Sequence, residues 1–139
     1  MDLTEKARVV FCKDRYAVVT SGIHIVRVTD DPEADCEMLV DDRHRNARGV
    51  VMGGALFTLA DFAAAVAANS DHIESGELHW VSLNASIHYL SPATGSCLRA
   101  HSLALKHGRT TALYLTTLTD YVSHKEVAIV ETTMMAVKK

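Results

Sequence analysis

One carboxylate, Asp61, lies inside the most apolar stretch of the chain, residues 45–70, which read RNARGVVMGGALFTLADFAAAVAANS. An unpaired carboxylate in an apolar interior is costly or takes up a proton, and Asp is a poor helix former. We therefore expect Asp61 to be paired, to face water or to take part in chemistry. Thr58 and Ala65 share its helix face, and such small side chains leave room for a partner helix or a substrate. From this residue alone, a hydrogen bond at a subunit interface and a catalytic role are equally open.

Two glycines, Gly53 and Gly54, stand at the expected start of the same helix. The first backbone N–H groups of a helix have no intrahelical partner and carry the positive end of its dipole. Glycine lets a ligand approach them, so the pattern is typical of an anion or oxyanion site, although tight helix packing also requires glycine. Gly53 and Asp61 are about 11–12 Å of helical rise apart, too far to contact one reacting carbon. Two chains with antiparallel helices would bring the glycine end of one chain near the acid of the other.

Length and composition predict one globular domain over residues 1–139. Apolar residues make up 48% of the chain, charged residues 22%, and the net charge is −3, which argues against a nucleic-acid or membrane-surface binder. The charged N-terminus does not resemble a signal peptide, and the apolar segment 52–68 is shorter than the roughly 20 residues that span a bilayer. Three scattered cysteines, Cys12, Cys36 and Cys97, fit a reducing cytoplasm. No histidine has metal-ligand spacing, so no metal site is expected.

Hydrophobic periodicity predicts two helices and six strands. The expected helices cover residues 2–13 and 52–68, and the expected strands cover 21–30, 36–41, 79–90, 97–106, 110–121 and 126–137, the last three joined as hairpins. An α+β fold with a curved antiparallel sheet wrapped around one long central helix satisfies this order. Because the helix is apolar nearly all round, it needs cover on most sides. A second subunit could supply part of that cover, so a dimer is expected.

Strict alternation along the strands predicts which side chains share a face. In strand 21–30, Ile23, Ile25 and Arg27 fall on one face and Val28 on the other. In strand 79–90, the apolar face comprises Val81, Leu83, Ala85, Ile87 and Tyr89. Ser82 then lies on the opposite face, where it is either a solvent-facing hydroxyl or part of a site. His44 is interpreted as a polar loop residue.

The segment HRNARGVVMGGALFTLADFA resembles the signature of hotdog-fold acyl-CoA thioesterases of the PaaI-like type, named for phenylacetic acid degradation. VSLNASIHYLSPA resembles the strand that follows the helix in that family, and KHGRT resembles its next hairpin. The resemblance covers about residues 20–137, in the family's order. It implies a hotdog fold and hydrolysis of an acyl-CoA thioester to a free acid and coenzyme A. Coenzyme A is then part of the substrate, and no separate cofactor is implied.

The resemblance assigns catalytic roles to four residues. Asp61 matches the helix acid that acts as general base or as nucleophile, and Gly53 matches the glycine whose N–H polarises the thioester carbonyl. Asn46 matches a loop asparagine that helps to bind the carbonyl or the attacking water, and Ser82 matches a strand hydroxyl that helps to hold water or the acid. The implied site is composite, with Asn46 and Gly53 from one subunit and Asp61 and Ser82 from its partner, in a dimer or a dimer of dimers.

The resemblance also implies where the substrate binds. Coenzyme A would lie along the subunit boundary, with Arg109 as the best candidate for its phosphates; other basic or flexible candidates are Lys106, His107 and Gly108. Gly54 lies beside the polarising glycine. One residue departs from the pattern, because Met52 stands where the family has a histidine. Methionine neither donates a hydrogen bond nor carries a charge, and its flexible apolar side chain could line an acyl pocket.

Three other functions stay open on sequence grounds. A hotdog hydratase or dehydratase would use a His–acid pair, and no histidine stands at the helix start here. A non-catalytic acyl-CoA binder is made plausible by Met52. A structural oligomer would use Asp61 only as an interface hydrogen bonder.

Overall fold

Two α-helices and six strands form the fold, which a computed structural model describes for residues 1–137. The helices are α1 (Leu3–Phe11) and α2 (Gly53–Ala68), and the strands are β1 (Ile23–Thr29), β2 (Glu33–Leu39), β3 (Trp80–Tyr89), β4 (Cys97–His107), β5 (Thr111–Asp120) and β6 (Lys125–Ala136). Short helical turns, η1 (Tyr16–Thr20), η2 (Asp42–His44) and η3 (Ser70–His72), connect them. The expected order of helices and strands is confirmed. The final two residues of the predicted domain, 138–139, lie outside the described part.

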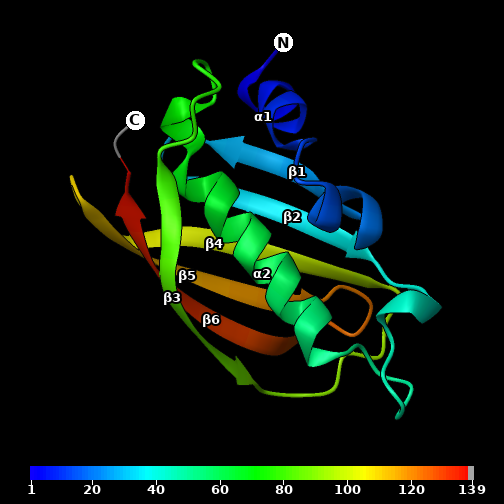
Figure 1. Ribbon diagram of the computed structural model, residues 1–139. Helices are drawn as coiled ribbons and strands as arrows, with labels where there is room; N and C mark the ends of the chain where they lie inside the picture. The colour runs from blue at the N-terminus through cyan, green and yellow to red at the C-terminus, as the bar shows by residue number, and fades with distance from the viewer. Residues whose placement is uncertain (138–139) are drawn as a thin grey trace.

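All six strands pair antiparallel in one sheet of order β1-β2-β4-β5-β6-β3. The sheet curves around α2, which lies along its concave face (Figure 1). The expected hairpins β4–β5 and β5–β6 are present, whereas β3 crosses over to pair with β6 at the far edge. The predicted α+β class, a curved antiparallel sheet around one central helix, is therefore confirmed.

Helix α2 is the centre of the hydrophobic core. Large side chains such as Leu59 and Val66 are completely buried against the sheet. Alanines between them are also buried, which lets the helix approach the strands closely. One stripe of the helix is less covered, and it comprises Gly54, Thr58, Asp61 and Ala65. Asp61 is therefore tolerated because it lies on the one stripe that the sheet leaves partly open.

Two β-bulges correct the predicted strand faces. In β1 the register shifts between Ile25 and Arg27, so Val28 is buried and Arg27 is exposed. In β3 the register shifts between Ser82 and Asn84, so Leu83 is an extra residue. Because of this shift, Ser82 shares the helix-facing side with Ala85, Ile87 and Tyr89, whose partners on β6 are buried. Strict alternation had placed Val81 and Leu83 on that side, and both are exposed.

One edge of the sheet, at β1, is covered by a helix, and the other, at β3, is open. Helix α1 covers the β1 edge, where Arg8 Nε donates to the Ile25 carbonyl at 2.9 Å and the Val28 N–H donates to Thr4 Oγ1 at 3.0 Å. The β3 edge carries Val81 and Leu83 with 43% and 56% of their surface exposed. An uncovered apolar edge strand is a surface on which another strand can pair.

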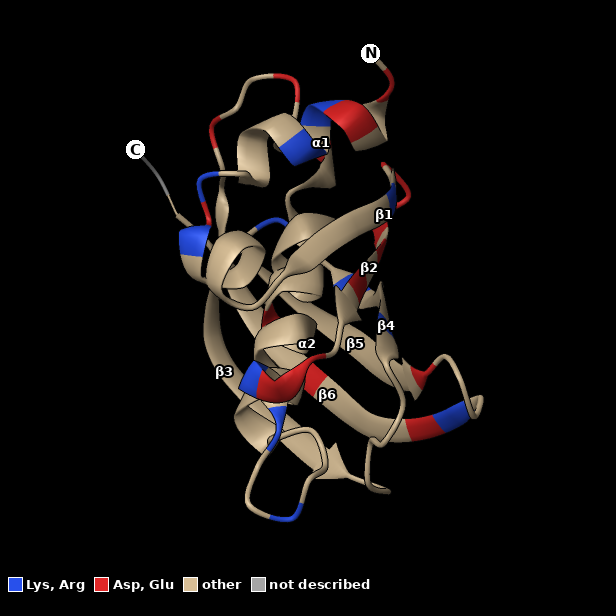
Figure 2. Ribbon diagram, turned by 90° about the vertical axis from the view of Figure 1, so that its right-hand side faces the viewer, with Lys and Arg blue, Asp and Glu red and all other residues tan. Residues whose placement is uncertain are grey.

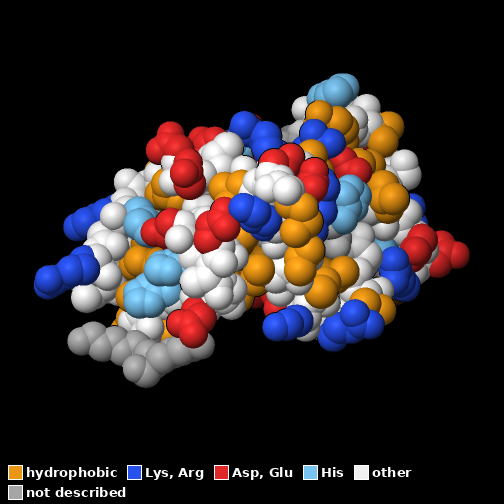
Figure 3. All heavy atoms as spheres, turned by 90° about the horizontal axis from the view of Figure 1, so that it is seen from above, with side chains coloured by type: hydrophobic (Ala, Val, Ile, Leu, Met, Phe, Trp, Pro, Cys, Tyr) orange, Lys and Arg blue, Asp and Glu red, His pale blue; other side chains and the backbone are white. Residues whose placement is uncertain are grey.

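Acidic and basic side chains are spread over the surface, with red and blue segments on helices, strands and loops alike (Figure 2). Seen from above, positive, negative, histidine and hydrophobic side chains alternate over the visible face (Figure 3). No helix within residues 1–137 combines the length and apolarity needed to cross a membrane.

Candidate functional site

Asp61 lies in a hollow of about 320 Å³ on the open stripe of α2. Thr58, Phe62 and Ala65 line it from the same helix, and Asp14 and Arg15 are among the residues that line it from the segment between α1 and β1. The acid is thus half-buried and reachable from solvent, rather than sealed in the core. This placement meets the first requirement for a catalytic carboxylate, which is access to a ligand.

Ser82 is the side chain that faces Asp61 from the sheet. Its Oγ donates to Asp61 Oδ1 at 3.4 Å, a long hydrogen bond. Burial raises the pKa of Asp61 above its ordinary value of 3.8, and the bond from Ser82 lowers it in part. A carboxylate with a raised pKa is a stronger base once ionised, so burial suits Asp61 to proton abstraction.

A second carboxylate, Asp14, lines the same hollow. Burial and the negative charge of Asp61 both raise the pKa of Asp14 above 3.8. Sequence reasoning missed this residue because Asp14 follows α1 in a loop, 47 positions before the helix acid, and no spacing links the two. The structure therefore adds one negative group to the surroundings of Asp61.

The start of α2 forms a separate half of the site. Met52 occupies the N-cap without a side-chain hydrogen bond, and within residues 1–137 no acceptor pairs with the Gly53 N–H. The dipole end of the helix is therefore available to a ligand. A side chain added at Gly54 would meet open space, whereas one at Gly53 would approach the Tyr89 hydroxyl to 2.9 Å. Met52 is 54% exposed at this end, so its thioether is accessible.

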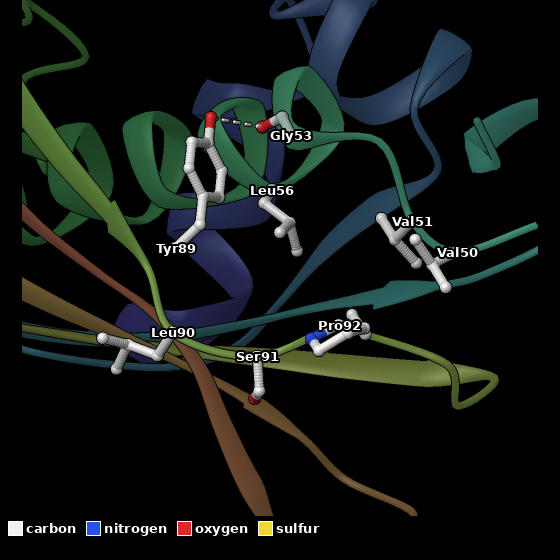
Figure 4. A pocket seen from close by; sticks show the side chains of 9 residues that line it. Val50, Val51, Gly53, Leu56, Tyr89, Leu90, Ser91 and Pro92 are labelled. Atoms are coloured by element: carbon white, nitrogen blue, oxygen red, sulfur yellow. Dashed lines mark hydrogen bonds between the residues drawn. The ribbon is translucent and has the colours of Figure 1, made fainter. Parts of the chain in front are cut away.

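A hollow of about 460 Å³ opens beside Gly53 (Figure 4). Tyr89 Oη donates to the Gly53 carbonyl at 3.2 Å, and the ring closes one side of the hollow. Leu56 of α2 and the segment after β3, residues 90–93, complete it, with Val50 and Val51 at the loop entrance. The lining is mostly apolar, which suits the pantetheine arm or an acyl group more than a charged group.

Asn46 shapes the loop that leads into α2. Its Oδ1 accepts from the N–H groups of Arg48 at 2.9 Å and Val50 at 3.3 Å, so the carboxamide oxygen is used by the turn. No bond to Asn46 Nδ2 occurs within the described residues, so that amide group remains a donor for a ligand. The turn and the proposed catalytic role are therefore compatible.

His44 is a buried structural residue rather than the polar loop residue expected from the sequence. Its Nδ1 accepts from the Asp41 N–H at 3.0 Å and its Nε2 donates to the Ser21 carbonyl at 2.7 Å. These partners define the neutral tautomer. The His44 carbonyl in turn accepts from the Met52 N–H at 2.8 Å, which fixes the chain just before the glycine pair.

Asn69, just past the last residue of α2, joins the helix to β3. Its Oδ1 accepts from the N–H groups of His79 at 2.8 Å and Trp80 at 2.9 Å. Its Nδ2 donates to the carbonyls of Ala65 at 2.9 Å and Trp80 at 3.3 Å. One fully buried amide therefore sets the position of the strand that carries Ser82 relative to the helix that carries Asp61.

The predicted coenzyme A residues lie on the β4–β5 hairpin. Arg109 is exposed and lines a hollow of about 380 Å³ with His79, Thr110 and Ala136. Lys106 is exposed as well. His107 points inward, with Nδ1 2.6 Å from the Tyr114 hydroxyl. The Gly108 N–H donates to the Thr111 carbonyl at 2.9 Å, and an added side chain there would meet that carbonyl.

One chain thus brings Asp61 and Ser82 together at the middle of α2 and leaves Gly53 and Asn46 at and before its first residue. Asp61 and Gly53 line different hollows, separated by eight helical positions. Tyr89 also belongs to the glycine half. The sequence places Tyr89 near the end of a predicted strand, before a turn. No pattern in the sequence predicts that it contacts Gly53.

The comparisons identify the family. Residues 48–125, more than half of the chain, match the family model of the thioesterase superfamily. The chain belongs to this superfamily. The thioesterase-family segment includes the glycine pair, Asp61, Ser82 and the β4–β5 hairpin, and the PaaI-like prediction made from the sequence is confirmed by structural similarity.

Solved structures extend the comparison of this superfamily member to the whole fold. The PaaI protein from the phenylacetic acid degradation operon of E. coli is 26% identical, with a TM-score of 0.82 over 99% of this chain and 97% of that chain. A thioesterase family protein of Silicibacter pomeroyi, 22% identical, has a TM-score of 0.86 over 99% and 100% and shows the shared hotdog fold. The smu.793 protein of Streptococcus mutans, solved bound to acetyl CoA, is 26% identical, with a TM-score of 0.73 over 84% and 90%.

A curated relative from Archaeoglobus fulgidus, described as a "Putative esterase", is 40% identical over 83 residues. The matched part is 59% of this chain and 51% of the relative, so the chain spans about half the length of that protein.

Proposed function

We propose that this member of the thioesterase superfamily hydrolyses acyl-CoA thioesters to a free acid and coenzyme A. The observation that carries the proposal is the half-buried Asp61 carboxylate, which faces an open hollow, has a raised pKa and accepts from Ser82. A purely structural carboxylate would need partners that fill its hydrogen-bonding capacity. Asp61 has only the long bond from Ser82 among the described residues, so it retains capacity to bind water.

The proposed reaction needs a base and a carbonyl polariser. Asp61 draws a proton from water as the water oxygen bonds to the thioester carbon. The carbonyl oxygen gains negative charge and accepts from the Gly53 N–H and from Asn46 Nδ2. The C–S bond then breaks, the acid is released and the sulfur of coenzyme A takes up the proton. Direct attack by Asp61, which gives an anhydride that water then hydrolyses, uses the same groups and is the second route.

A second copy of the chain completes the site in this proposal. Gly53 at the start of α2 and Asp61 at its middle are about 12 Å of rise apart, so each chain offers two half-sites. Pairing of two copies through their open β3 edges would cover Val81 and Leu83 and set the two α2 helices side by side. In an antiparallel arrangement, each Asp61 would then face the other copy's Gly53. A dimer of dimers is our expectation for the full assembly.

The substrate's coenzyme A would follow the subunit boundary. Arg109 and Lys106 are exposed cations on one hairpin and are the proposed phosphate contacts. His107 contributes through Nε2, because Nδ1 is engaged by Tyr114. We also infer a cytoplasmic location, since all three cysteines lie in the described residues as free thiols.

The test is thiol release from short, aromatic and long acyl-CoAs by the wild type and by Asp61→Asn. Loss of the general base is expected to lower kcat about 10²–10⁴-fold. Asp31→Asn is the matched control, because Asp31 is an exposed turn residue outside both hollows. Full activity in Asp61→Asn would remove Asp61 from the mechanism. Binding of several acyl-CoAs without turnover by the wild type would favour the non-catalytic binder, and reversible hydration of an enoyl-CoA would favour the hydratase.

Thermal unfolding of the same variant separates catalysis from folding. The folded-state pKa of Asp61 is above its unfolded value, so ionisation costs stability as pH rises above about 4. Asp61→Asn is therefore expected to melt higher than the wild type at pH 7 and equally at pH 3. An inactive variant that melts higher has lost chemistry and not structure.

A further inference from the structure

Phe62 borders two hollows. It lines the Asp61 hollow of about 320 Å³ and also a second hollow of about 210 Å³, whose other lining includes Phe11, Val18, Ile23 and Ile25. The second hollow lies between α1, η1 and β1, behind the open stripe of α2. Phe62 is the one residue that these two linings share.

The Phe62 side chain is tightly packed. Only 4% of Phe62 is exposed, and its ring stands edge-on to Phe11 with centroids 5.7 Å apart and planes at 81°. Phe11 is 1% exposed and comes from α1, so the pair joins the N-terminal helix to α2. Packed aromatic pairs of this geometry are favourable beyond their burial.

The two hollows differ in chemistry. The Asp61 hollow mixes polar groups such as Asp14, Arg15 and Thr58 with Ala17 and Ala65, whereas side chains of Phe, Val and Ile dominate the second. An acyl group whose carbonyl is at Asp61 can therefore run over the apolar part of its hollow until it reaches Phe62. Burying a methylene beyond that point would be favourable, but the ring occupies the path.

We propose that Phe62 is a specificity-determining residue that limits the acyl group to short or compact acids by closing the Asp61 hollow against the apolar space under α1. The inference rests on the proposed thioesterase function and deepens it.

The experiment measures kcat/KM for butyryl-CoA, octanoyl-CoA and lauroyl-CoA in the wild type and in Phe62→Ala. The wild type is expected to prefer butyryl-CoA. Removing the ring joins the two hollows, so that a long acyl chain can extend into the second one. Each methylene of the chain that becomes buried there adds roughly a fourfold gain in binding. The lauroyl-to-butyryl ratio is therefore expected to rise about tenfold or more. Phe62→Leu, which keeps more of the packing, is expected to shift the ratio in the same direction by less.

Phe11→Leu is the matched control. It alters the second hollow on the far side of the contact, but it keeps an apolar side chain packed against Phe62 and leaves Phe62 itself in place. Its lauroyl-to-butyryl ratio is expected to equal that of the wild type.

Each outcome decides between the two proposals. A wild type that hydrolyses lauroyl-CoA as well as butyryl-CoA overturns the inference about Phe62 without needing any variant to fold. Unchanged ratios in folded Phe62→Ala and Phe62→Leu overturn it as well, and both results leave the thioesterase function standing. A wild type that hydrolyses none of the three, nor any other acyl-CoA, overturns the proposed function.

Discussion

Replacing Asn69 with alanine should loosen the connection between the helix and the strand that form the Asp61 half of the site. The side chain makes four hydrogen bonds and is 1% exposed. Alanine removes all four and leaves the N–H groups of His79 and Trp80 without their acceptor. A buried donor left unpaired costs about 1–3 kcal/mol.

The expected cost follows from where each donor lies. The Trp80 N–H is buried, so its full penalty applies, whereas His79 is half-buried and water can reach its N–H in part. We expect a loss of about 2–4 kcal/mol in the free energy of unfolding. For a domain of this length, that corresponds to a fall in Tm of roughly 10 °C.

Urea denaturation followed by tryptophan fluorescence measures the change, because Trp80 is the only tryptophan in the chain and lies at the affected position. Asn69→Asp is the matched variant, since its carboxylate keeps both acceptor contacts and loses the two donor contacts. The N–H groups of His79 and Trp80 keep their acceptor in Asn69→Asp, so this variant should lose less free energy of unfolding than Asn69→Ala. Its negative charge faces the two carbonyls that Nδ2 bonds in the wild type, which offsets part of the difference. If Asn69→Ala lowers the free energy of unfolding by less than about 1 kcal/mol, water replaces the amide, and the Asn69 side chain does not position β3.

Two further predictions concern charge and space at the site. Asp61→Asn should lower the pKa of Asp14, because the negative charge of Asp61 that raises it is removed; an unmoved Asp14 carboxyl signal in an NMR pH titration would show that the two carboxylates are not coupled. Gly54→Ala should stabilise the helix by about 0.5–1 kcal/mol, since its new methyl group meets open space. Gly53→Ala should gain less and should reduce kcat, because the methyl group displaces Tyr89. Paired melting curves and kinetics check this, and equal behaviour of the two variants would contradict it.

Local pattern was sufficient for most of the architecture. The long run of apolar and small residues from Gly53 predicts a central helix, and period-two alternation predicts the strands, since both follow from backbone geometry. Alternation failed where a single extra residue, Leu83, shifts the register of β3. A bulge depends on the partner strand, which the strand's own residues do not specify, and it is the bulge that turns Ser82 toward Asp61.

The sequence by itself determined the family pattern, the central helix and the identity of its one acid, because these depend on residue types at short spacing. Only the tertiary structure decided what surrounds that acid. The long bond from Ser82, the second carboxylate at Asp14 and the two hollows that share Phe62 all join segments that are distant along the chain. Their distances follow from how the sheet curves around α2 and how α1 packs on β1, and such packing depends on the whole set of buried side chains at once.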